Sequence, residues 1–102
     1  MNNARRKSLK SLIKQLNDLA EGFEALKNDS EEICYAIEEI RDEEQDSFDN
    51  LPEGIQESSR GERMEEVIDT LDEAISNLEY LDIDDIISYI NETIENLENA
   101  IS

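Results

Sequence analysis

Residues 9–40 read LKSLIKQLNDLAEGFEALKNDSEEICYAIEEI, and this stretch decides the fold. Its apolar side chains recur at alternating spacings of three and four residues, which is the a/d pattern of a helix that packs along one seam. Ser30 is the one polar member of that seam; the others are Leu9, Leu12, Leu16, Leu19, Phe23, Leu26, Ile33, Ile37 and Ile40. The phase is kept across Asn28-Asp29-Ser30, which favours one continuous helix over about residues 3–47, although these short polar residues could also cap a new helix.

A hinge over residues 48–59 separates this first arm from a second one. The hinge reads FDNLPEGIQESS, and the residue before its proline is pushed out of helical geometry. Pro52 is expected to open one short turn through Gln56. Ser59 and Glu62 have the spacing of a capping box, which predicts that the second arm starts here.

The second arm covers residues 60–101 and carries two apolar faces. The first consists of Met64, Val67, Ile68, Leu71, Ala74, Ile75 and Leu78; the second consists of Ile83, Ile86, Ile87, Ile90, Ile94, Leu97 and Ile101. Because the register shifts near Asp82, either this residue caps a new helix or the arm stays helical with a local change of supercoil. The predicted fold is a single all-α domain over residues 1–102, an antiparallel helical hairpin or coiled-coil-like bundle of two long arms and two to four helices.

The charge of the chain narrows the classes of partner. Its 102 residues include 9 Lys and Arg against 28 Asp and Glu, a net charge of -19, which is too acidic for general binding to nucleic acids or anionic membranes. We therefore expect basic partners. The hydrophobic content of 37% allows only a modest core, which favours completion by self-association into a homo-oligomer.

The distribution of charge favours antiparallel arms. Residues 1–27 hold six basic and three acidic groups, whereas residues 64–102 hold twelve acidic groups and no Lys or Arg. An antiparallel arrangement would lay the basic start of the chain beside Glu92, Glu95 and Glu98. Exposed pairs of this kind contribute only about 0 to 1 kcal/mol each, so their expected role is to fix orientation.

The residues that usually carry catalysis are scarce. There is no His, which excludes His-containing nucleophilic and metal sites, and no Gly-rich phosphate loop. Cys34 has no flanking cation and is expected to be a packed thiol. The abundant paired carboxylates fit a solvated surface better than acid-base chemistry. We expect no enzymatic activity, no cofactor and no metal, and the single Cys together with the lack of a signal peptide or long apolar stretch indicates the cytoplasm.

One segment resembles a known group of proteins. RDEEQ at residues 41–45, FDNLPE at 48–53 and Ile55-Gln56 are similar to a motif of small, mostly uncharacterised helical proteins of bacteriophages and prophages, and the similarity continues through Gly61-Glu62 to Glu73-Ala74. The resemblance implies a phage or mobile-element origin, and thus the cytoplasm of a host bacterium. It brings no functional residue with it.

Three functional hypotheses follow. The first is a non-enzymatic inhibitor whose acidic surface imitates nucleic acid and blocks a basic host protein, such as a defence nuclease. Its candidate surface comprises Glu65, Glu66, Asp69, Asp72, Glu73, Asp84, Asp85, Glu92 and Glu95. The second is a helical homo-oligomer that sequesters a small nucleotide signal at an anion site made of Arg5, Arg6, Lys7 and Lys10. The third is a structural coiled-coil subunit.

Overall fold

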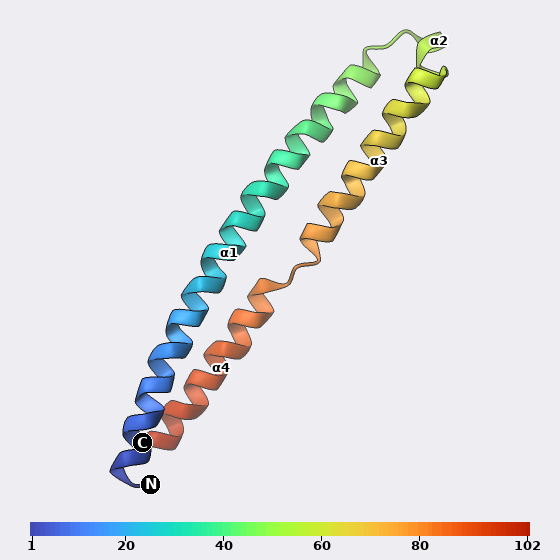
Figure 1. Cartoon of the computed structure of the whole chain (residues 1–102). Coiled ribbons are helices and arrows are strands. Elements are labelled where there is room, and N and C mark those ends of the chain that lie inside the picture. Colours follow the sequence, from blue (N-terminus) through green and yellow to red (C-terminus); the bar gives the residue numbers. More distant parts are fainter. The chain divides into compact units, whose positions relative to one another are not determined.

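The computed structural model describes all residues, 1–102, and all of the regular secondary structure is helical. These are α1 (Asn3–Asp49), α2 (Glu53–Gln56), α3 (Ser59–Glu79) and α4 (Ile83–Ile101), and there is no strand (Figure 1). They form two compact units: unit 1 comprises residues 1–29 and 82–102, and unit 2 comprises residues 30–81. The predicted all-α class is confirmed. No helix combines the length and the apolar character needed to span a bilayer.

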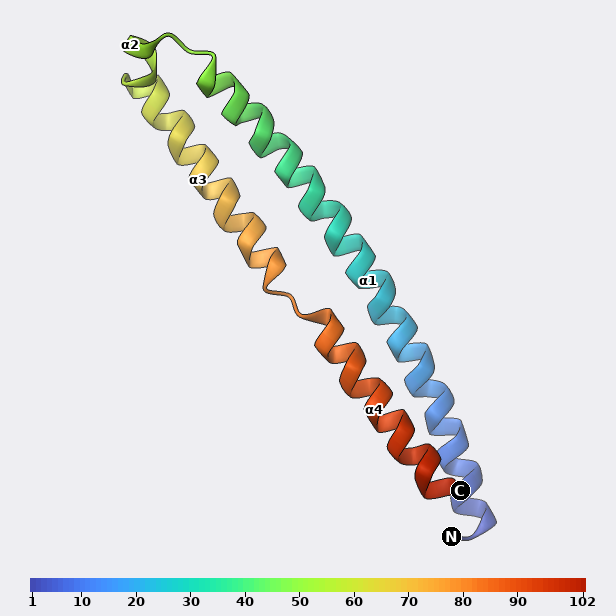
Figure 2. The same cartoon turned by 180° about the vertical axis from the view of Figure 1, so that it is seen from behind.

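Each unit is an antiparallel pair of helical segments. In unit 1, the first half of α1 lies beside α4, and both termini of the chain lie at the same end of the pair (Figure 2). In unit 2, the second half of α1 turns back through α2 into α3. The antiparallel direction predicted from the charge distribution is therefore confirmed within each unit.

Helix α1 is continuous through Asn28–Ser30, as the preserved heptad phase favoured. Its start is capped by Asn2, whose side-chain oxygen accepts the backbone N–H of Arg5 at 2.8 Å. It ends at Asp49, close to the predicted residue 47, because Leu51 precedes a proline and cannot continue the helix.

The register of the packed face differs from the predicted seam. Half of that seam is turned inward, namely Leu9, Leu16, Phe23, Ser30 and Ile37. The other half is exposed and is called the outer row from here on: Leu12, Leu19, Leu26, Ile33 and Ile40. Its place on the packed side is taken by Arg6, Ile13, Ala20, Lys27, Cys34, Arg41 and Phe48. The prediction of these five core positions was wrong because the aliphatic stems of Lys27 and Arg41 pack inward while their charged ends reach carboxylates of the facing helices.

The hinge contains the short helix α2. Pro52 stands at its N-cap, and the predicted turn through Gln56 is confirmed. The side chain of Gln56 donates from Nε2 to the carbonyl oxygen of Phe48 at 3.1 Å, which ties α2 back to the end of α1. The expected capping box of Ser59 and Glu62 is not formed: the N-cap of α3 is Ser58, and its hydroxyl donates to the carbonyl oxygen of Ile55 instead.

Gly61 lies where α3 passes closest to α2. It is buried, and a Cβ added there would lie 2.0 Å from the carbonyl oxygen of Gln56. Only a residue without a side chain fits between these two backbones.

The apolar faces of the second arm are packed as predicted, with one exception. All seven predicted residues of α3 are buried or half-buried, and Ile68 is only 5% exposed. On α4, Ile87 and Ile94 are buried, whereas Ile86 is exposed. The break near Asp82 is real: Asp82 caps α4 by accepting the backbone N–H of Asp85 at 3.1 Å, so the first of the two predicted alternatives is confirmed.

Candidate interaction surfaces

The acidic candidates on α3 form an exposed face of unit 2. Glu65, Glu66, Asp69 and Glu73 are exposed. Of these, Glu65, Asp69 and Glu73 follow one another at four-residue intervals, which gives about one carboxylate per helical turn of about 5.4 Å. Glu66 pairs with Arg63 at 3.2 Å, whereas the other three form no ion pair. These three carboxylates have no counter-charge, so they give this face a negative charge that attracts cations.

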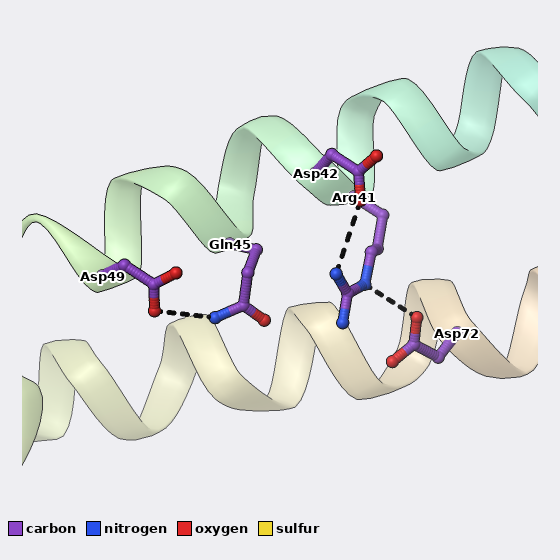
Figure 3. Close-up of polar contacts among 5 residues, drawn as sticks. All are labelled: Arg41, Asp42, Gln45, Asp49 and Asp72. Atoms are coloured by element: carbon purple, nitrogen blue, oxygen red, sulfur yellow. Dashed lines mark hydrogen bonds and ion pairs between the residues drawn. The ribbon is translucent and has the colours of Figure 1, made fainter.

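Asp72, the fifth candidate on α3, faces α1 instead. Its Oδ1 accepts a hydrogen bond from Arg41 Nε at 2.8 Å, and this bond raises the pKa of the guanidinium (Figure 3). Arg41 also contacts Asp42 at 3.4 Å, and Gln45 donates to Asp49 at 3.0 Å one turn further along α1. Asp72 therefore helps to align the two helices of unit 2.

A groove of about 230 Å³ runs beside this ion pair. It is lined by Arg41, Gln45, Phe48, Glu65, Ile68, Asp69 and Asp72. Arg41 engages Asp72, which leaves the carboxylates of Glu65 and Asp69 on the α3 side without a cation. The groove thus combines apolar lining from Phe48 and Ile68 with the two carboxylates of Glu65 and Asp69, which form no ion pair.

The acidic candidates on α4 belong to unit 1. Asp84 forms an ion pair with Lys27 of α1 at 2.8 Å, whereas Asp85, Glu92 and Glu95 are exposed and form no ion pair. The pKa of Asp85 is raised, chiefly by its hydrogen bond to the carboxylate of Asp82 and by the charge of that group. Asp84 and Asp85 also occupy the first turn of α4, where a negative charge stabilises the helix by its interaction with the helix dipole.

The predicted anion site at the start of α1 is dispersed over the helix surface. Arg5, Lys7 and Lys10 are exposed, and Arg6 is half-buried with an Nε atom that has no hydrogen-bond partner. None of the four forms an ion pair, so the expected pairing with Glu92, Glu95 and Glu98 is absent although the helices are antiparallel. The basic start of α1 therefore keeps its charge unpaired.

Cys34 is half-buried on the packed side of α1. Its Sγ lies 3.9 Å from Glu38 Oε1, and Sγ and the carboxylates of Glu38 and Glu79 lie within 4.8 Å of one another. Desolvation and the charges of both glutamates raise the pKa of the thiol. These three ligand atoms lie close enough together to hold a metal ion, although exposed acidic groups often cluster in this way without one.

The outer row of α1 is the main surface that sequence analysis assigned to the core. Leu12 and Leu19 are 47% and 49% exposed, and Leu26, Ile33 and Ile40 are 56%, 56% and 57% exposed. In unit 1 this row borders an apolar groove of about 420 Å³, lined by Leu12, Gln15, Leu16, Leu19 and Leu97. The signal was present in the sequence as a third heptad row, because Ile13, Ala20 and Phe48 give α1 more apolar positions than one seam needs.

The chain matches no protein-family model, no curated protein and no solved structure.

Proposed function

We propose that the protein is a non-enzymatic inhibitor that binds a basic, nucleic-acid-binding protein through the acidic face of α3. The groove beside Arg41 carries the proposal, because Glu65 and Asp69 line it without a cation while Phe48 and Ile68 supply an apolar base. A Lys or Arg side chain fits such a groove, since its stem packs on apolar atoms and its charge reaches the carboxylates.

The rest of the surface supports a partner of the same charge. Residues 64–102 contain twelve acidic groups and no basic one, and only Glu66, Asp72 and Asp84 of these form ion pairs. A protein that binds DNA presents cations spaced for phosphates. Its binding to this acidic surface would displace the cations that surround the carboxylates, as its binding to DNA displaces those that surround the phosphates. The resemblance to phage proteins adds the expectation that the partner is a host protein of the bacterial cytoplasm, such as a defence nuclease.

The test compares two variants of equal net charge. In the first, Glu65→Gln, Asp69→Asn and Glu73→Gln remove the three candidate acids of α3 that form no ion pair. In the matched control, Asp18→Asn, Glu21→Gln and Glu24→Gln remove three exposed acids of α1. Both variants should keep the helical content of the natural protein, because all six positions are exposed.

Each tagged protein is then incubated with bacterial lysate at several salt concentrations, with and without double-stranded DNA as a competitor. We expect the natural protein and the control to retain a basic protein that DNA displaces and that is lost as the salt concentration rises. The α3 variant should not retain it. Equal retention by the α3 variant, or retention that DNA does not affect, would show that this face does not imitate nucleic acid.

A further inference from the structure

We infer that the outer row of α1 is the interface of an antiparallel homodimer, in which α1 packs against α1 of a second copy. The row consists of five branched aliphatic side chains at strict seven-residue intervals on one continuous helix, and each is about half exposed. Seven-residue spacing keeps such residues on one helix face, and the row supplies one of the two positions per heptad that a partner helix buries in a coiled coil. The inference does not depend on the proposed role of α3.

The outer row is more uniformly apolar than either of the two rows that α1 packs against the other helices. One packed row includes Arg6, Lys27 and Arg41 and the other includes Ser30, whereas the outer row has no polar member. In unit 1 the groove of about 420 Å³ between Leu12, Leu19 and Leu97 offers a recess beside this row. Knobs from a second helix would fill such a recess.

Gly22 is a second, separate observation on the same side of α1. It lies between Leu19 and Leu26, and a Cβ added there would meet nothing within 4 Å in this chain. Nor does its φ require glycine, because no residue of the chain has a positive φ. A mid-helix glycine weakens a helix, and at this open position the missing side chain leaves room for the close approach of another backbone.

The geometry of α1 points to a second copy of this chain as the occupant. Leu26 is the middle member of the outer row and also the midpoint of α1, which runs from Asn3 to Asp49. A two-fold axis at Leu26 would pair Leu12 with Ile40 and Leu19 with Ile33 of the other copy. Every member of the row then has a partner, as a self-complementary interface requires.

The charges of α1 favour the antiparallel direction. Residues 3–16 contain five basic and no acidic groups, whereas residues 36–49 contain seven acidic groups and one basic group. Antiparallel pairing lays each basic end along an acidic end, while parallel pairing would bring like charges together. The five basic residues form no ion pair within the chain, so they are available to the second copy.

Sedimentation equilibrium of the full chain tests the interface. We expect the natural protein to form a particle of twice its 11.7 kDa mass, and Leu26→Lys to raise the dissociation constant at least roughly 100-fold by bringing two charges together on the axis. The matched control is Asn17→Lys, which adds the same charge to an exposed residue on the opposite side of α1 from Leu26 and should leave the dimer intact. Circular dichroism should show equal helical content in both variants.

Cysteine cross-linking tests the direction in a Cys34→Ser background. Leu12→Cys mixed with Ile40→Cys should give a disulfide-linked dimer on mild oxidation, whereas Leu12→Cys alone should not. The opposite pattern would overturn the antiparallel arrangement. A natural protein that stays monomeric, a larger assembly, or a dimer that survives Leu26→Lys would overturn the interface itself.

Discussion

Gly61→Ala should destabilise the protein although alanine is the better helix former. The added Cβ would lie 2.0 Å from the carbonyl oxygen of Gln56, 2.5 Å from its carbonyl carbon and 2.7 Å from its Cα, whereas ordinary contacts start at 3.4 Å. All three are backbone atoms, so no side-chain rotation relieves the overlap. The hinge around α2 has to move away from α3 by more than about 1 Å.

The net effect is the difference of two contributions. Overpacking of this kind costs about 1–3 kcal/mol, and the hydrogen bond from Gln56 to Phe48, which holds α2 in place, is worth about 1 kcal/mol more. Higher helix propensity returns at most about 1 kcal/mol. We expect a loss of about 2 kcal/mol, which corresponds to a fall in melting temperature of roughly 10 °C for a chain of this size.

Thermal unfolding followed by far-ultraviolet circular dichroism measures this shift. The matched control is Gly54→Ala, a substitution in the same hinge at which the new Cβ meets nothing within 4 Å. That variant should melt within a few degrees of the natural protein. If Gly61→Ala melted at the same temperature as Gly54→Ala, the close approach of α2 and α3 would not exist in solution.

Further outcomes follow from other contacts. Ile94→Ala should cost about 2–4 kcal/mol in urea unfolding, because it empties one of the few buried positions of the chain. Asp82→Ala should destabilise the protein by about 1 kcal/mol, because it removes the cap of α4. In hydrogen exchange, the backbone amides of residues 83–101 should lose protection while those of the other helices keep theirs. A double-mutant cycle of Arg41→Gln and Asp72→Asn should give a coupling of about 0.5–1 kcal/mol, since the pair is only partly exposed, and a value near zero would mean that the pair does not form. Alkylation of Cys34 should reach half its maximal rate at a higher pH in the folded than in the urea-unfolded protein, because a raised pKa keeps the thiol protonated as the pH rises; equal midpoints would contradict the burial beside Glu38.

The fold was largely predictable from local signals. Pro52 prevents the preceding residue from adopting helical geometry, and Asp82 caps the start of a helix. Both residues mark helix boundaries at the positions predicted from the sequence. The continuity of α1 followed from the unbroken heptad phase. Gly61 could not be recognised as a contact residue, because its role depends on how closely a segment five residues earlier approaches it.

The packed face of α1 was predictable only in part. Periodicity shows that apolar rows exist, but α1 has three of them, and spacing alone does not decide which two face the rest of the chain. The structure selects the row that contains Lys27 and Arg41, whose charges meet Asp84 and Asp72 across the helix pairs. A prediction that ranks the rows by hydrophobicity therefore places Leu26 and Ile33 in the core instead of Lys27 and Arg41, although the latter two form ion pairs with the facing helices.

The segment between α3 and α4 makes this chain suited to fragment complementation. Tyr80 is 84% exposed, and the three residues 80–82 are the covalent link between α4 and α3. A cut after Tyr80 would leave α4 as a short peptide whose buried Ile87 and Ile94 still match the first half of α1 within unit 1. Residues 1–80 and a synthetic peptide of residues 81–102 would then reassemble without a covalent link, so labels or altered charges can be placed on α4 by peptide synthesis.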